Sequence, residues 1–277
     1  MPPDLSSRAT EMPDWISGVC EAGAAAIHYQ RTGGDGSPLV LLHGLMGSGA
    51  CWAPVARCLQ DKFDVVMPDA RGHGTSSSPL HGYRYEDHAS DVVGLVRELG
   101  LSAPVILGHS MGGMTAAVVA GQVGELIRAV ILVDPTFLSA QRQREVRDSD
   151  VAEQHRRILA QTKDDVVADI RRRHPHRSPE IAVLMAEARL QTRLAAFDVL
   201  TPLNPEFRQL VREINVPSLL VIGDAPVVSL QVAHELQALN SHLRVEQVQN
   251  AGHGLPYDQP ERLAAVVRSF LDTMGTL

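Results

Sequence analysis

Short apolar runs alternate with longer stretches of mixed composition along most of this 277-residue chain. The runs are rich in Val, Leu and Ile, which favours strands buried inside a sheet. The stretches between them are long enough for helices, so the pattern predicts a mostly parallel sheet covered by helices on both faces. Residues 18–20 and 25–29 predict an antiparallel hairpin at the sheet edge. The runs are PLVLL from residue 38, FDVVM from 63, PVIL from 104, AVILV from 129, PSLLVI from 217 and LRVEQV from 243.

One long segment breaks this alternation. Between residues 135 and about 217 no convincing strand occurs, and apolar residues recur at helical spacing, as at Leu190 and Leu194. We therefore expect a helical lid inserted after the sixth strand, with residues such as Phe137 and Phe197 closing a pocket. The predicted organisation is a first part of the α/β core at 1–135, the lid at 136–205 and the second part of the core at 206–277.

The charge of the chain limits its partners. Asp and Glu number 32 against 25 Lys and Arg, which gives a formal net charge of −7. A nucleic acid or an anionic membrane would require a basic surface on the protein, so neither is an expected partner. The expected partner is a small-molecule substrate, and the oligomeric state is left open.

The cysteines and the apolar segments indicate the compartment. Cys20, Cys51 and Cys58 form no CxxC pair and no spacing typical of zinc ligands. The stretch before Trp15 carries acidic residues and no apolar core, unlike a secretory signal. No apolar run approaches the roughly 18 residues of a membrane helix. These features predict a cytoplasmic protein, and no metal or organic cofactor is expected.

The strongest local motif is GHSMG at 108–112, which directly follows the apolar run at 104–107 and precedes a stretch of small residues. A G-x-S-x-G sequence between a strand and a helix forms a tight, strained turn. Its glycines are required because side chains would collide there. We expect Ser110 to be a nucleophile exposed above the sheet, with the first amides of the following helix directed at a developing negative charge.

A second glycine-containing segment, HGL at 43–45, follows an earlier predicted strand. The backbone N–H groups of Leu45 and Met111 are therefore predicted to form an oxyanion hole beside the serine. His43 is expected to hydrogen-bond its own loop rather than to carry a proton. The segment DARGHGTS at 69–76 is expected to supply turn residues and a buried ion pair.

The general base of such a site is expected after the last strand, where NAGHG occupies 250–254. His253 lies between that strand and a helix that starts near Pro260. We predict that His253 accepts the proton of Ser110.

Five segments in this order resemble the lid-bearing α/β-hydrolase superfamily, from roughly Ile27 to the end of the chain. The resemblance implies a serine hydrolase, in a superfamily that hosts esterases, lactonases, amidases, carbon–carbon hydrolases, dehalogenases and cofactor-free peroxidases or oxygenases. A dehalogenase would carry Asp in place of Ser110. The segments are HGLMG at 43, DARGHGTS at 69, GHSMGG at 108, VDP at 133 and AGHGLP at 251.

The third member of the triad departs from the common family pattern, which places an acid after the seventh strand as G-x-x-D. That position here is Pro226, and Asp224 precedes it. Some members place the acid after the sixth strand instead, among them the N-formylmaleamate deformylases, which this chain resembles in its LVDP and AGH segments. Asp134 ends that strand, although an Asp-Pro pair is also typical of a turn. We predict Asp134 as the acid, with Asp224 as the alternative.

Together these residues predict two-step acyl transfer on an ester, lactone or amide. His253 takes the proton of Ser110, Ser110 attacks a carbonyl, and water then hydrolyses the acyl-enzyme. Two other functions remain open. The same residues occur in cofactor-free peroxidases, oxygenases and carbon–carbon hydrolases, and the fold also serves ligand receptors with little turnover.

A basic run, RRRHPHR at 171–177, lies inside the expected lid. Such a run suits an acidic substrate, but a solvated helix end is its commoner cause. We therefore expect these arginines to face solvent.

Overall fold

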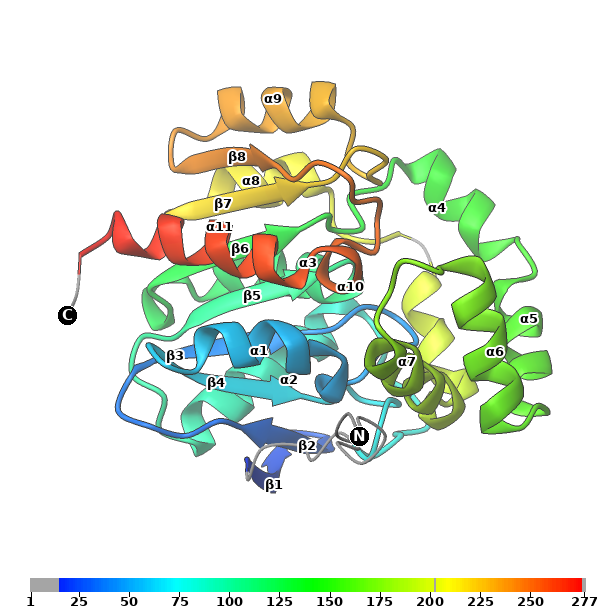
Figure 1. The fold of residues 1–277 in the computed structure, drawn as a ribbon. Helices are drawn as coiled ribbons and strands as arrows, with labels where there is room; N and C mark the ends of the chain where they lie inside the picture. Colours follow the sequence, from blue (N-terminus) through cyan, green and yellow to red (C-terminus); the bar gives the residue numbers. More distant parts are fainter. Residues whose placement is uncertain (1–14, 202, 276–277) are drawn as a thin grey trace, which may run out of the picture.

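The computed structural model describes residues 15–201 and 203–275. Its centre is an eight-stranded sheet with strand order β1-β2-β4-β3-β5-β6-β7-β8 (Figure 1). Residues 1–14, in which the sequence lacks the apolar core of a signal, lie outside the described residues. The strands are β1 (Ile16–Ala22), β2 (Ala25–Arg31), β3 (Ser37–Leu42), β4 (Phe63–Pro68), β5 (Val105–His109), β6 (Ala129–Val133), β7 (Ser218–Ile222) and β8 (Leu243–Gln247).

The strands from β3 to β8 pair in parallel, whereas β1 and β2 form an antiparallel hairpin that joins the sheet through β4. The α/β class and the edge hairpin predicted from the sequence are thus confirmed. β8 forms the opposite edge, and its burial alternates from buried Leu243 to exposed Arg244. This half-exposed position explains why polar residues interrupt the last apolar run.

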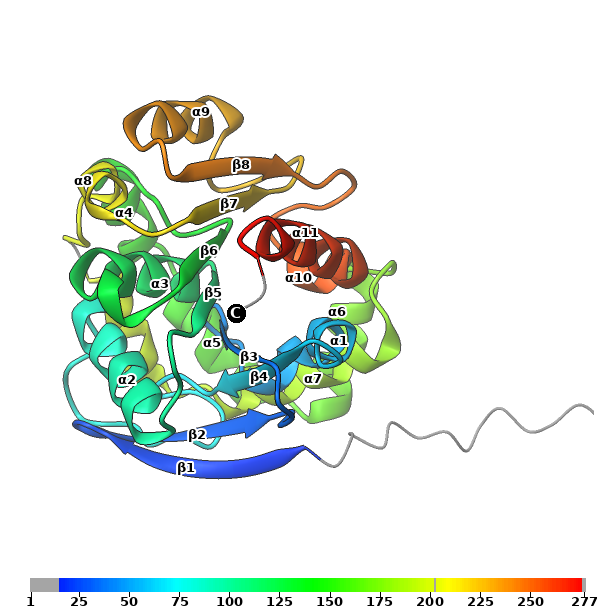
Figure 2. The ribbon, with the colours of Figure 1, turned by 90° about the vertical axis from the view of Figure 1, so that its left-hand side faces the viewer.

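Successive side chains of the central strands face opposite sides of the sheet, and each side is covered by helices (Figure 2). In β3, Leu39 and Leu41 pack beneath α1 and α11, whereas Val40 and Leu42 pack in the core on the other face. A sheet buried on both sides requires apolar residues throughout its strands, as the sequence has. One face carries α1 (Ala53–Leu59) and α11 (Pro260–Asp272); the other carries α2 (Tyr85–Glu98), α3 (Met111–Gln122), α8 (Phe207–Glu213) and α9 (Leu230–Leu239).

The chain between β6 and α8 forms a group of helices beyond the ends of the strands (Figure 1). Three of these helices are capped by side chains at their starts: Ser139, Thr162 and Ser178 accept hydrogen bonds from backbone N–H groups in the first turns of α4, α6 and α7. We call this group the insertion. It contains α4 (Ala140–Arg147), α5 (Val151–Leu159), α6 (Lys163–Arg173), α7 (Pro179–Gln191) and the 3-10 helix η3 (Leu194–Leu200).

The insertion is anchored to the core by its own apolar cluster. Ile170 of α6 and Ile181 of α7 are buried with Cys51 of η1 (Gly49–Trp52), the short helix that follows the 43–45 loop. This contact fixes α7 over the segment where the sequence predicts half of the oxyanion hole.

The remaining short helices are η2 (Gly124–Leu126) and α10 (Leu255–Asp258), the latter directly after the loop that carries His253. Among the described helices, none has both the length and the apolar character needed to cross a membrane.

Candidate active site

Ser110 occupies the turn between β5 and α3 with a strained backbone, φ 55° and ψ −116°. Its N–H donates to the carbonyl oxygen of Val133 on β6, 3.1 Å away. A Cβ on Gly108 would lie 2.0 Å from the carbonyl oxygen of Gly112, and a Cβ on Gly112 would lie 2.3 Å from that of Leu42. The turn therefore closes only because both positions are glycine, as the motif predicts.

The turn presents Ser110 to His253. The Ser110 Oγ lies 3.0 Å from His253 Nε2, and His253 Nδ1 lies 2.6 Å from Asp134 Oδ2. These three residues come from the ends of β5 and β6 and from the loop after β8. The structure thus brings together three side chains that the sequence separates by up to 143 positions. The expectation that Ser110 stands exposed above the sheet is wrong: the residue is only 8 % exposed, because it faces a cavity rather than open solvent.

Asp134 is fully buried, and its carboxylate is held from two sides. Oδ2 accepts the Val227 N–H at 2.9 Å in addition to its contact with His253, and Oδ1 accepts the Val228 N–H at 3.0 Å. Hydrogen bonds of this kind stabilise a buried charge. Asp224, the alternative acid, is exposed and accepts the backbone N–H of Asn250 at 2.6 Å. The carboxylate in contact with the histidine is therefore that of Asp134.

The two residues expected to supply the oxyanion hole lie next to Ser110: Leu45 lines the cavity there, and Met111 follows Ser110 in the chain. Gly47 N–H donates to the Gly44 oxygen in a tight turn, which leaves Leu45 at the turn beside the serine. A Cβ on Gly44 would lie 3.0 Å from the Ser110 Cβ, so this loop is in direct contact with the elbow. Met111 is the first residue of α3. Among the described residues, neither the Leu45 nor the Met111 N–H donates a hydrogen bond.

His43 holds this loop in place. Its Nδ1 lies 2.8 Å from the Gly44 oxygen, and its Nε2 accepts the Ala70 N–H at 2.9 Å. A ring that donates from one nitrogen and accepts at the other is neutral. Burial lowers the pKa of His43 as well. Its contacts are those expected of a loop-positioning residue.

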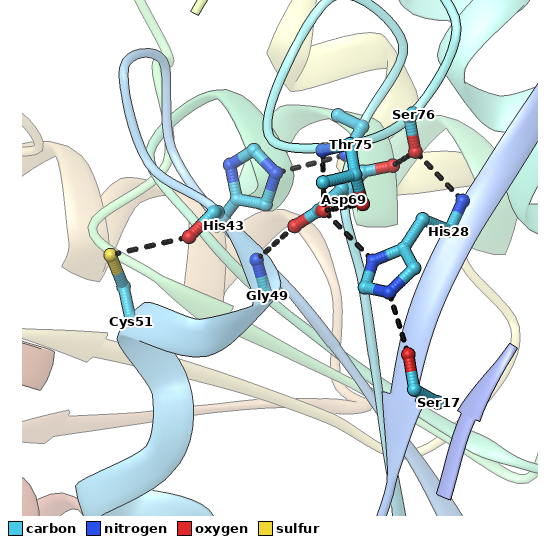
Figure 3. A network of polar contacts seen from close by, with 10 residues as sticks. Ser17, His28, His43, Gly49, Cys51, Asp69, Thr75 and Ser76 are labelled. Atoms are coloured by element: carbon cyan, nitrogen blue, oxygen red, sulfur yellow. Dashed lines mark hydrogen bonds and ion pairs between the residues drawn. The ribbon is translucent and has the colours of Figure 1, made fainter. Parts of the chain in front are cut away.

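The loop after β4 ties the same region to the edge of the sheet (Figure 3). Asp69 accepts the Gly49 N–H at 2.7 Å and the Thr75 N–H at 3.0 Å, and it contacts His28 Nδ1 at 3.0 Å. The Asp69 carboxylate thus links β2 with the start of η1 and with the rest of its own loop. The buried ion pair expected here is that of Arg71 with Asp91 on α2, at 2.5 Å.

His109, the residue before Ser110, has a role that the sequence patterns did not indicate. Its Nε2 donates to the His253 carbonyl oxygen at 2.7 Å, so the β5 strand holds the backbone of the histidine loop. Burial, with the charge of His253, lowers the pKa of His109 to about 3. A neutral His109 therefore positions His253 and does not compete with it for protons.

A cavity of about 270 Å³ opens at Ser110 and His253. Its far wall comes from α7 and the loop before it, through Met185, Arg189, Arg177 and His174. The aromatic residues expected to close the pocket lie elsewhere, and that expectation is wrong. Phe137 stacks on Phe207 at 5.1 Å, and Phe197 packs on His155 at 4.9 Å, both within the apolar interior of the protein.

The basic run divides into two parts. Arg172 and Arg173 are 76 % and 65 % exposed and pair with Asp169 one turn earlier, as expected for a solvated helix end. The Arg177 side chain is only 6 % exposed and donates from Nε to Asp258 of α10 at 2.6 Å. The expectation that these arginines face solvent is therefore wrong for Arg177. The sequence alone does not separate these neighbours, because the loop at 174–178 folds one of them back towards the core.

Clusters able to bind a metal are absent from residues 15–201 and 203–275: no three His, Cys, Asp or Glu side chains are suitably grouped there.

Comparisons with known proteins agree with this architecture. The chain is 26% identical to the 2-(acetamidomethylene)succinate hydrolase of Mesorhizobium japonicum over 87% of its length and 90% of the relative. It is 29% identical to the N-formylmaleamate deformylase of Pseudomonas putida over 92% of its length and 96% of the relative. The solved structure of N-formylmaleamic acid deformylase from Pseudomonas putida S16 superposes with a TM-score of 0.77 at 25% identity, covering 91% of this chain and 100% of that one.

The sequence profile of the alpha/beta hydrolase fold matches residues 37–260, a span that contains Ser110, Asp134 and His253. The parallel strands, the strand-to-helix turn at Ser110 and the insertion after β6 lie within the same span. The chain therefore belongs to the α/β-hydrolase fold family.

Proposed function

We propose that this protein is a serine hydrolase that cleaves an amide or ester bond of a small molecule. The observation that carries the proposal is the continuous contact from Ser110 through His253 to Asp134, at 3.0 and 2.6 Å. Hydrogen-bond reach between a nucleophile, a base and an orienting acid is the geometric signature of nucleophilic catalysis.

In the proposed mechanism each contact has a chemical task. Asp134 accepts a hydrogen bond from the Nδ1–H of His253, which leaves Nε2 free to take the Ser110 proton as the hydroxyl attacks the carbonyl carbon. The N–H groups of Leu45 and Met111 then stabilise the negative oxygen of the tetrahedral intermediate. The imidazolium returns its proton to the leaving group, and the acyl group remains on Ser110 until a water, activated by His253, hydrolyses it.

The proposed bond class has independent support from relatives. Their names describe hydrolysis of an acetamidomethylene succinate and removal of a formyl group from a maleamate, so both are hydrolases of small N-acyl compounds. The cavity of about 270 Å³ lies just below the range of roughly 300 to 1,000 Å³ typical of drug-sized ligands. We infer that the insertion acts as a lid that limits substrate size, with α7 over the nucleophile.

The test is a panel of small formamides, acetamides, lactones and aryl esters assayed with wild-type protein and Ser110→Ala. Loss of the nucleophile in a triad lowers the rate by roughly a millionfold. Ser110→Ala should therefore have no measurable turnover of the substrates that the wild type cleaves, with unchanged folding by urea denaturation.

Ser90→Ala is the matched control, because Ser90 is exposed on α2 away from the cavity. It should retain wild-type rates. Turnover by Ser110→Ala at a tenth of the wild-type rate would refute the proposed mechanism.

A further inference from the structure

The cavity at Ser110 is cationic, although the chain as a whole carries a net charge of −7. Two arginines line it, Arg177 and Arg189. The charge of Arg177 is balanced by Asp258, which also contacts His176 at 3.0 Å. The carboxylate of Asp134, which is buried below the cavity, is already in contact with His253 Nδ1. Within the part of the chain that the structure describes, the charge of Arg189 has no such counterpart.

Arg189 forms no ion pair and no side-chain hydrogen bond with any residue in the described ranges 15–201 and 203–275. The carboxylate of Asp169, which attracts it from a distance, is already paired with Arg172 and Arg173. Partial burial, followed by the charges of Arg177 and Arg173, lowers the pKa of Arg189. An arginine nevertheless keeps its proton in a protein, so an uncompensated positive charge borders the cavity.

Burying a charge without an opposite charge beside it costs free energy. Such a charge is therefore expected at functional sites, where a bound ligand supplies the opposite charge. The guanidinium presents a planar fork of donors that matches a carboxylate in two parallel hydrogen bonds. Met185, one helical turn before Arg189, lines the same cavity with Leu45 and Tyr257. The cavity thus combines apolar walls with a single unpaired cation.

We propose that Arg189 binds a carboxylate group of the substrate and so makes the enzyme selective for small acyl compounds that carry a negative charge away from the scissile bond. The proposal rests on the proposed hydrolase function. Arg177, fixed by Asp258 and by a contact from its guanidinium to Met185 Sδ at 3.4 Å, shapes the cavity beside it. Arg189 is the specificity residue, and Ser110 and His253 perform the chemistry.

The experiment compares two esters with the same acetyl group, 4-acetoxybenzoate and its neutral isostere 4-acetoxybenzamide. A charged hydrogen bond of this kind corresponds to a roughly 10- to 100-fold preference in kcat/KM. The wild type should show that preference, and Arg189→Met should remove it mainly by raising KM for the anionic ester. Arg189→Lys, which keeps the charge without the planar fork, should restore part of it.

The carboxylate of the natural substrate can lie on the acyl side instead of the leaving-group side, so a binding assay accompanies the kinetics. Succinate should slow the labelling of Ser110 by a neutral fluorophosphonate, whereas succinamide should not. Arg189→Met should lose this protection. Labelling of Ser110 in that variant also shows that its active site is folded.

Arg171→Met is the matched control, because it removes the same charge from an exposed position of α6 in the insertion. It should keep both the ester preference and the protection by succinate. The proposal is supported if the wild type shows either effect, Arg189→Met loses it and Arg171→Met keeps it. Absence of both effects in the wild type, or persistence of both in Arg189→Met, would overturn it.

Failure of the hydrolase function gives a different result. In that case the wild type neither hydrolyses the esters nor reacts with the fluorophosphonate, while thermal-shift measurement still reports whether succinate binds at Arg189. Hydrolysis of both esters at equal rates, without succinate protection, would refute the role of Arg189 and leave the hydrolase intact.

Discussion

Replacement of Asp134 by Asn is the most informative perturbation of the triad, because it keeps the shape of a fully buried side chain and removes its charge. Three donors converge on the carboxylate: the N–H groups of Val227 and Val228 and the Nδ1 of His253. An amide has a single oxygen, so its NH₂ group must face one of these backbone N–H groups in either orientation. One orientation also directs the NH₂ at His253, which forces the proton onto Nε2 and removes the base for Ser110.

The expected magnitudes follow from these contacts. Both orientations lose the negative charge that stabilises the imidazolium, and loss of the correct tautomer with that charge lowers kcat by roughly 10⁴-fold. A buried donor left without an acceptor costs about 1 to 3 kcal/mol, so the free energy of unfolding should fall by a similar amount.

The assay measures kcat on the best aryl ester of the panel, with urea denaturation for stability. Asp224→Asn is the matched control, because its exposed carboxylate supports only the Asn250 N–H in the described structure. It should keep kcat within a few-fold of wild type. A loss of less than tenfold in Asp134→Asn, or a larger loss in Asp224→Asn, would refute the assignment of the acid.

Two further predictions concern the fold. Gly108→Ala should abolish activity and cost about 3 kcal/mol or more, because its Cβ would lie 2.0 Å from a backbone oxygen. Gly121→Ala, near the C-terminal end of α3, should be neutral or stabilising, because its Cβ would meet only an ordinary contact at 3.7 Å. Equal melting temperatures of the two variants would contradict this. Burial lowers the pKa values of His88 and His109 to about 3, below the roughly 6.5 of an unfolded histidine. As the pH falls, the unfolded chain therefore binds protons at these histidines before the folded protein does. The free energy of unfolding should decrease from pH 6.5 towards pH 3 by at most about 1.4 kcal/mol per pH unit for each histidine. His88→Gln should reduce that slope in urea denaturation at pH 7, 6 and 5, and an unchanged slope would exclude His88 as a source.

The sequence predicted the sheet and the elbow because both depend on local patterns. Strands buried on both faces need continuous apolar runs, and a strand-to-helix turn as tight as that at Ser110 needs glycine at 108 and 112. His253 was identifiable from its place after the last strand. The choice between Asp134 and Asp224 was harder, because it depends on how two loops approach His253 in space.

The cavity wall was not predictable from the same patterns. Arg189 lies in the apolar helical stretch of α7, and nothing in its neighbours indicates which face of that helix meets Ser110. Arg177 and Asp258 are 81 positions apart and meet only because the insertion folds back onto α10. The one local signal is the spacing of Met185 and Arg189, which places both on the same side of α7. Phe137 and Phe197 were misassigned because large aromatic residues fill the interior as readily as they close a pocket.

The most direct test of the account is to trap the acyl-enzyme on Ser110. Wild-type protein mixed with 4-nitrophenyl acetate should release a burst of nitrophenolate comparable to the enzyme concentration if deacylation is slower than acylation. Acid quenching during the burst, followed by peptide mass mapping, should locate the acetyl group on Ser110 and nowhere else at comparable yield. Turnover of the ester without any acetyl group on Ser110, together with undiminished turnover by Ser110→Ala, would contradict the proposed mechanism.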